Sequence, residues 1–348
     1  MGERRVDEPL REEHRTVVIT GASRGLGFAS AKHLYDRGWQ VVAAMRSPDA
    51  GLARLREATG ARDDDDRLIG VPLDLGDPAS IDAAAKAIEA AVGVPYAVVH
   101  NAGISAAGMV EESPLELWQN MFQTHVMGPV QLTQALLPGM RAAGRGRIVM
   151  VSSQGGVRGM PAIAAYSASK GALERWAESM AGEIAPFGLG VTVLVAGVFD
   201  TDIITDEGTT DNRDLDGPYS ALHTTINKRG RLAIRIANPP AKFARALAKA
   251  LEDTAPYTKH PVGPDAHMLV LSSRVLPQAA MHHMSRIAMG IPRQGAIRDG
   301  TAALTASQRL MIRAATVVPA PVMQRIALLI MKLQSAPKQS AQESENHG

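Results

Sequence analysis

A short apolar run that ends in a glycine-rich loop is the feature that most constrains the fold of this chain. Within residues 15–38, RTVVIT has the composition of a buried strand, GASRGLG follows at once, and FASAKHLYDRG has a helical pattern. Gly21, Gly25 and Gly27 allow a tight turn and the close approach of backbone to a pyrophosphate, and the following helix N-terminus offers unpaired N–H groups. The segment therefore predicts a dinucleotide-binding strand, loop and helix.

Extended apolar runs alternate with helical patterns along most of the chain, which is typical of a parallel sheet covered on both faces. Six runs are predicted strands, at residues 17–20, 39–45, 68–74, 96–100, 146–152 and 190–197. The longest helical pattern between them covers residues 115–140. We predict an α/β fold with a doubly wound parallel sheet, the Rossmann fold, in a single main domain. Its predicted bounds are residues 15–290, between a charged N-terminal tail (1–14) and a helical C-terminal extension (291–348).

A tyrosine and a lysine stand four residues apart in the helical stretch 164–184, so that both side chains lie on one helix face. At roughly 4 Å and an effective dielectric of about 20, the Lys170 ammonium would stabilise a Tyr166 phenolate by about 4 kcal/mol. The pKa of Tyr166 would fall toward neutrality, where a phenol can exchange protons. Ser153 ends the strand run GRIVMVSS, at the sheet edge where ligands bind in open α/β folds.

Four motifs in the same order and at the same separations give the chain a family resemblance. Thr20–Gly27 (TGASRGLG), Asn101–Gly103 (NAG), Ser153, and Tyr166 with Lys170 resemble the T-G-x-x-x-G-x-G, N-A-G, S and Y-x-x-x-K motifs of short-chain dehydrogenases/reductases. The resemblance covers roughly residues 15 to 290. It implies hydride exchange between a nicotinamide cofactor and a carbonyl or alcohol, with Tyr166 as acid/base, Ser153 on the substrate oxygen, and Lys170 on both tyrosine and ribose.

The resemblance also implies which residues hold the cofactor. Asp74 would contact the adenine amino group, the N-A-G segment would line the adenine ribose, and Thr201 would hold the nicotinamide carboxamide. The implied set is Gly21, Ser23, Arg24, Gly25, Leu26, Gly27, Arg46, Asp74, Asn101, Ala102, Gly103, Tyr166, Lys170, Val198 and Thr201. Asp74 could also cap a turn, and Asn101 and Gly103 could shape one. No metal is needed for this chemistry.

Two arginines predict NADP(H) rather than NAD(H). The end of the second predicted strand has no acidic residue to bind a ribose 2′-OH, and Arg46 follows it directly. Arg24 lies within the glycine loop. Two guanidinium groups suit a 2′-phosphate, although either one alone could be an ordinary surface arginine.

The chain departs from the family pattern at two positions. His125 stands where the family usually has an asparagine that orders a water linked to the active-site lysine, and Ala196 stands where it usually has proline. His125 is either a proton relay or a packing residue. As a relay it would add an ionisation to the pH–rate profile between about pH 5.5 and 7.5.

Composition excludes several other classes of protein. A net charge of +2, without a basic block, argues against a nucleic-acid binder. The chain contains 0 cysteines, which suits a reducing, cytoplasmic location, and its charged N-terminus does not resemble a secretory signal. The four adjacent aspartates in ARDDDDR are taken as a solvated turn rather than a metal site.

Residues 202–232 lie where the family carries its substrate loop, and their conformation is left open by the sequence. By resemblance, the predicted substrate is a medium to bulky apolar carbonyl or alcohol of steroid, retinoid or lipid type. Four side chains could line an apolar pocket or fill the core instead: Met109, Met160, Ile163 and Met268. Two alternatives stay open, a catalytically silent NADP(H)-binding redox sensor and an epimerase that uses bound cofactor transiently.

The C-terminal extension carries an apolar stripe at helical spacing, formed by Val322, Ile326, Leu329, Ile330 and Leu333. We expect this helix to dock on the body or on a second subunit, with peripheral contact to a membrane interface as the alternative. No run is long and apolar enough to span a bilayer, and residues 335–348 are expected to be disordered. The resemblance also implies a homodimer or homotetramer.

Overall fold

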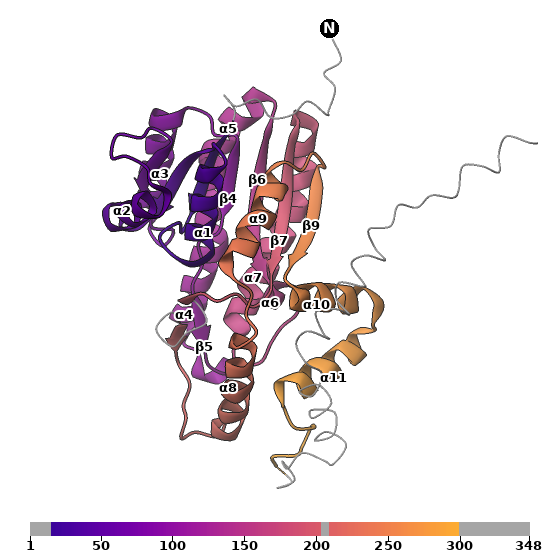
Figure 1. Cartoon of the computed structure of the whole chain (residues 1–348). Coiled ribbons are helices and arrows are strands. Elements are labelled where there is room, and N and C mark those ends of the chain that lie inside the picture. Colours follow the sequence, from indigo (N-terminus) through magenta and orange to yellow (C-terminus); the bar gives the residue numbers. More distant parts are fainter. Residues whose placement is uncertain (1–14, 203–208, 299–348) are drawn as a thin grey trace, which may run out of the picture.

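The computed structural model describes residues 15–202 and 209–298, and a parallel sheet forms its centre (Figure 1). In the described part of the chain seven strands form this sheet, in the order β3-β2-β1-β4-β6-β7-β9, and every pairing is parallel. They are β1 (Thr16–Thr20), β2 (Gln40–Met45), β3 (Leu68–Pro72), β4 (Ala97–His100), β6 (Gly146–Ser153), β7 (Leu189–Ala196) and β9 (Tyr257–Val262). All six strands predicted from sequence, and the doubly wound fold, are confirmed.

Helices cover both faces of the sheet. One layer holds α1 (Gly25–Asp36), α2 (Pro48–Thr59) and α9 (Pro240–Leu251), and the other holds α3 (Pro78–Val92), α5 (Gly128–Ala143) and α7 (Ala164–Ile184). Side chains of β1 point alternately to the two faces of the sheet. Val17 and Ile19 pack in the core under the α1, α2 and α9 layer, and Val18 packs in the core under the α3, α5 and α7 layer. The strands are buried on both faces, which explains their continuous apolar sequences.

The stretch predicted as one helix at residues 115–140 is interrupted. It forms α4 (Leu115–Phe122), one π-helical turn (Gln123–Met127) and then α5. Pro129 has no N–H for the bond to residue 125 that an α-helix requires, and its ring crowds that carbonyl, so the helix widens before it. Gly128 fits this turn tightly, since a Cβ there would lie 2.6 Å from the carbonyl oxygen of Leu75.

The segment whose conformation the sequence left open contains a strand and a helix. β8 (Thr209–Asp211) pairs in parallel with β5 (Ser105–Ala107), and α8 (Ser220–Ile234) follows. Figure 1 shows α4, β5 and α8 grouped beyond one end of the main sheet. β9 closes the main sheet, and the apolar residues after it form α10 (Pro264–Val275), followed by α11 (Gln278–Met289).

Strand order places the ligand crevice between β1 and β4. From β1 the chain runs outward to β2 and β3 and then crosses back to β4, so the connections leaving β1 and β4 diverge at this point. The segments after β1, β4 and β6 therefore lie at one edge of the sheet. No helix in the described ranges is long and apolar enough to cross a membrane. The apolar stripe at Val322–Leu333 and the predicted disordered end lie outside the described residues.

We predict that Gly27→Ala lowers the free energy of unfolding by about 1–3 kcal/mol, the usual cost of overpacking. A Cβ at Gly27 would lie 2.2 Å from the carbonyl oxygen of Gly21 and 2.5 Å from the Asn101 Nδ2 atom. Gly182→Ala is the matched control, because its Cβ meets nothing within 4 Å on an exposed face of α7. That control should raise stability by about 0.5–1 kcal/mol. Chemical denaturation measures the free energy of unfolding of both variants. A Gly27→Ala protein as stable as Gly182→Ala would contradict the close packing of Gly27 against Gly21 and Asn101.

Candidate active site

One cavity at the carboxyl edge of the sheet collects most of the residues singled out in the sequence. Those that line it are Gly21, Ser23, Arg24, Gly25, Leu26, Arg46, Asp74, Asn101, Ala102, Gly103, Ser153, Tyr166, Lys170 and Thr201. Gly27, Val198 and His125 do not line it. Residues that the sequence did not single out also contribute, among them Met45, Ile104, Thr124 and Phe199.

The glycine loop is held by side chains from the neighbouring strand ends. Gly21 and Gly25 have φ angles of 68° and 57°, the left-handed region that favours glycine. The Asn101 amide donates to the carbonyl oxygens of Thr20 at 2.9 Å and Gly21 at 3.3 Å. The Thr20 hydroxyl accepts the backbone N–H groups of Asn101 and Ala102. Asn101 thus has the structural role that its sequence context allowed, and it also lines the cavity.

Gly27 and Val198 support the cavity from outside it. Gly27 leaves room for the Asn101 amide. The Val198 N–H donates to Asp265 Oδ2 at 2.7 Å, and the same oxygen accepts Gln154 Nε2 at 2.8 Å. Asp265 therefore fixes the loop after β7 against the segment after β6. Sequence reasoning missed it, since an aspartate in the first turn of α10 gives no sign of partners 67 and 111 residues away.

The outer part of the cavity carries charged groups of both signs. Arg24 and Arg46 are exposed and line it, and neither forms an ion pair with any residue in the described ranges. Asp74 also lines it, and its Oδ1 atom accepts the Gly76 N–H at 2.9 Å. Asp74 thus caps a turn, as the sequence allowed, while its side chain remains at the cavity wall.

Tyr166 and Ser153 meet in the inner part. Ser153 ends β6, and Tyr166 lies in the first turn of α7. Burial raises the pKa of Tyr166, and its hydrogen bond with Ser153 acts in the opposite direction. The Ser153 hydroxyl also accepts the Gly155 N–H at 3.3 Å.

The Lys170 ammonium is bound to backbone. Its Nζ atom donates to the carbonyl oxygen of Val151 at 2.8 Å and lies 5.9 Å from the centre of the Tyr166 ring. The predicted net lowering of the Tyr166 pKa is wrong for this arrangement, because burial dominates and raises it. Burial also lowers the pKa of Lys170 to about 8, with Glu174 opposing the change. The lysine is still mainly protonated at neutral pH.

His125 lies on the π-helical turn with both ring nitrogens bound to protein. Its Nε2 atom accepts the Ile104 N–H at 3.1 Å, and Nδ1 is 2.8 Å from the Ser169 hydroxyl. The imidazole packs edge-on to the Tyr166 ring, with centroids 5.5 Å apart. Gly103 keeps space open beside Lys170, because a Cβ at this position would lie 3.2 Å from His125 Nε2 and 3.7 Å from Lys170 Nζ.

Of the two roles left open for His125, a proton relay and a packing residue, the structure favours packing. Burial first, and then the charge of Lys170, hold the pKa of His125 well below its ordinary value. Because Nε2 accepts a backbone N–H, the neutral ring carries its proton on Nδ1. Neither nitrogen is free to hold a relay water, so the geometry favours a role in placing Ile104 and the Tyr166 ring.

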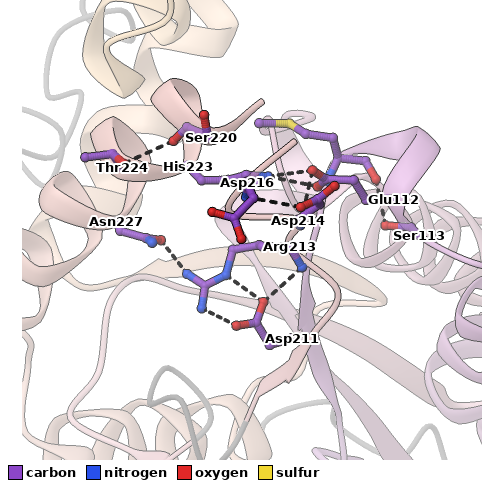
Figure 2. A network of polar contacts seen from close by, with 11 residues as sticks. Glu112, Ser113, Asp211, Arg213, Asp214, Asp216, Ser220, His223, Thr224 and Asn227 are labelled. Atoms are coloured by element: carbon purple, nitrogen blue, oxygen red, sulfur yellow. Dashed lines mark hydrogen bonds and ion pairs between the residues drawn. The ribbon is translucent and has the colours of Figure 1, made fainter. Parts of the chain in front are cut away.

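A polar network joins α8 to the segment after β5 (Figure 2). His223 Nε2 lies 2.8 Å from the carboxylate of Glu112, which also accepts the Met109 N–H. Arg213 donates to the Asp211 carboxylate and to the side-chain oxygen Oδ1 of Asn227. These contacts fix β8 and α8 beside β5, the strand that follows Ile104 in the chain.

Four side chains that could have lined an apolar pocket or filled the core do not gather in the active-site cavity. Met109, Ile163 and Met268 do not line the active-site cavity, and Met160 lines a separate hollow between α7 and α11. Met109 is 8% exposed and belongs to the core. Methionine fills gaps of many shapes, so sequence alone could not distinguish the two roles.

Comparison with known proteins finds relatives that cover most of this chain. A family model described as short chain dehydrogenase matches residues 15–212. An uncharacterized oxidoreductase, YusZ, from Bacillus subtilis is 35% identical over 54% of this chain and 66% of its own length. A 3-ketodihydrosphingosine reductase from Bacteroides thetaiotaomicron is 30% identical over 78% of this chain and 96% of its own. A solved short-chain dehydrogenase from Streptomyces avermitilis superposes with a TM-score of 0.67 at 31% identity, covering 81% of this chain and 99% of that one.

We predict that His125→Asn weakens the acid dependence of stability. An imidazole whose pKa is lowered on folding stabilises the fold above pH 6.5, and this contribution is lost as pH falls toward the folded pKa. Below about pH 6, the slope of unfolding free energy against pH should therefore fall by about 1.4 kcal/mol per pH unit in the variant. Denaturation between pH 6 and 4 measures it, with His282→Asn, on an exposed position of α11, as the control. Equal slopes for His125→Asn and the unmodified protein would contradict the buried neutral imidazole.

Proposed function

The chain belongs to the short-chain dehydrogenase/reductase family, and from this we propose that it is an NADP(H)-dependent oxidoreductase that interconverts a ketone or aldehyde and an alcohol. The observation that carries the proposal is the single cavity shared by the glycine loop and by Ser153, Tyr166 and Lys170. A catalytically silent nucleotide-binding protein would have no need of these three groups together. The intact set therefore favours an enzyme over a sensor.

The cavity fits a nicotinamide dinucleotide. The loop leaves no room for a side chain at Gly21, where a Cβ would lie 2.8 Å from the Ala102 Cα atom, so bare backbone faces the ligand. The N-terminal end of α1 follows this loop and favours a pyrophosphate. At the inner end Thr201 would hold the carboxamide and Lys170 the ribose hydroxyls.

The reaction follows from the protonation states of the inner groups. A bound nicotinamide supplies or accepts hydride at C4. Tyr166 is neutral at pH 7 because burial raises its pKa, so it can donate its proton to the oxygen of a ketone being reduced. Ser153 donates a hydrogen bond to the same oxygen and stabilises the charge that develops there. The Lys170 ammonium then favours the phenolate that remains.

The preference for NADP(H) rests on Arg24 and Arg46. Both guanidinium groups stand at the cavity wall, and no described carboxylate neutralises them. No acidic residue ends β2 to accept a ribose 2′-OH. A 2′-phosphate would supply the missing counter-charge.

For the substrate we propose a medium to bulky apolar ketone of lipid type. The relative from Bacteroides thetaiotaomicron, which spans most of this chain, is named for the reduction of 3-ketodihydrosphingosine. Near the reacting groups the wall includes Ile104 and Phe199.

We also propose a cytoplasmic homodimer or homotetramer. Subunits in this family often meet through the helices that flank Tyr166, and α7 carries Trp176 there. The Trp176 ring lies 5.8 Å from the His100 ring, so it also packs within the subunit.

We predict that Tyr166→Phe reduces turnover by about 10²–10⁴-fold, the usual contribution of a general acid. The assay is NADPH absorbance with a panel of ketones, from small polar to steroid-sized and sphingoid. Cofactor affinity in the same variant should change little, which separates lost chemistry from lost binding. Activity on apolar ketones that survives the substitution would contradict the role of Tyr166. If the unmodified protein reduces no compound of the panel, the catalytically silent redox sensor is favoured instead.

We predict that the protein binds NADPH more tightly than NADH and that Arg46→Asp reverses much of this preference. A charge-assisted bond to phosphate contributes about 1.5–3 kcal/mol, so the substitution should weaken NADPH binding about tenfold or more. Arg145→Asp is the matched control, since Arg145 is exposed directly before β6 and does not line the cavity. Equal dissociation constants for the two cofactors in the unmodified protein would refute the proposed preference.

A further inference from the structure

One buried acidic group near the site has no part in the chemistry described so far. Glu174 lies on α7 one turn after Lys170, and it is 2% exposed. Its Oε1 atom accepts the Ser152 hydroxyl at 2.7 Å, and its Oε2 atom accepts the Lys259 ammonium of β9. Burying a carboxylate costs several kcal/mol unless it is paired and hydrogen-bonded. Both oxygens of Glu174 are used in this way.

This pair adjoins the strand end that holds the reacting groups. Ser152 stands between Val151, whose carbonyl oxygen accepts the Lys170 ammonium, and Ser153. The packing leaves no space for a side chain at Gly156, where a Cβ would lie 2.5 Å from the Ser152 hydroxyl and 2.8 Å from Glu174 Oε1. Movement of the Glu174 carboxylate would therefore disturb the end of β6.

We propose that Glu174 is a positioning residue that keeps the Lys170 ammonium charged, and that Lys259 on β9 sets how strongly Glu174 does so. The proposal rests on the proposed function only in taking Lys170 as the lysine that assists Tyr166. Nothing in the family motifs extends to Lys259, which lies 85 residues from Glu174 in the chain.

The groups that act on the charge of Lys170 lie on several elements packed against it. Burial drives the pKa of Lys170 down to about 8, and the Glu174 carboxylate on the same helix opposes it. His125 on the π-helical turn is neutral because its own pKa is low, and burial keeps Tyr166 protonated. β6 presents only a carbonyl oxygen. The remaining charged groups of the cavity wall are Arg24, Arg46, Asp74 and Asp202.

Two substitutions should move the titration of Lys170 in opposite directions. Glu174→Gln keeps the shape and an oxygen for Ser152 but removes the negative charge, so Lys170 should lose its proton at lower pH. Lys259→Met keeps the stem but removes the positive charge beside Glu174, so Lys170 should lose its proton at higher pH. We expect a shift of about one pH unit in each case. The double variant should titrate close to the unmodified protein.

The test is competitive amine labelling of the full-length protein from pH 6 to 10, with the Lys170 peptide quantified by mass spectrometry. Glu178→Gln is the matched control, because it removes the same charge one turn farther along α7 at an exposed position. Thermal melts establish that each variant is folded. Opposite shifts with an unmoved control support the proposal. No shift in the titration of Lys170, or shifts in the same direction, would overturn it. If Glu174→Gln does not fold, the comparison of Lys259→Met with the control decides whether the proposal holds.

The labelling needs neither substrate nor cofactor, so its outcome is independent of the proposed function. If Lys170 titrates as expected but no carbonyl compound is reduced, the proposed function fails and this inference stands. If the enzyme is active, the alkaline limb of its pH–rate profile should move down for Glu174→Gln and up for Lys259→Met. A lower rate with an unmoved limb would indicate a merely structural role and contradict the inference.

Discussion

The contact between the glycine loop and the end of β4 is the constraint on which the site depends. The Asn101 amide and the Thr20 hydroxyl tie together the segments that leave β1 and β4, where the connections diverge. Gly27 makes the close approach possible, because any larger residue would meet the Gly21 carbonyl or the amide. The glycine loop and the strand next to β6 are thereby fixed as one unit. Ser153, Tyr166 and Lys170 are then held in a fixed position relative to the loop.

Burial dominates the electrostatics of the inner groups. It raises the pKa of Tyr166 and lowers those of Lys170 and His125, so each is driven toward its neutral form. A neutral tyrosine suits proton donation, and a neutral histidine suits a packing role. In the proposed reaction only the lysine needs its charge, and Glu174 is the buried group that opposes the effect of desolvation on it.

The sequence predicted what depends on local pattern. The six strands, the glycine loop and the Tyr166–Lys170 spacing follow from periodicity and motif, and the structure places them as expected. The sequence did not predict the π-helical turn at His125, the direction of the Lys170 ammonium or the contacts of Asp265. These depend on burial and on partners from distant elements, such as Val151 for Lys170, which no local pattern encodes. The Glu174–Lys259 pair was missed for the same reason.

The central claim is that the glycine loop and Tyr166 serve one hydride transfer. Its most direct test uses two preparations of NADPH in separate reactions, one deuterated on each face of C4, with a lipid-type ketone as substrate and mass spectrometry of the alcohol formed. One preparation should place a single deuterium on the carbinol carbon and the other should place none, because a fixed cavity presents a single face of the nicotinamide to the substrate. Alcohol without deuterium from both preparations, or equal labelling from the two, would contradict the claim.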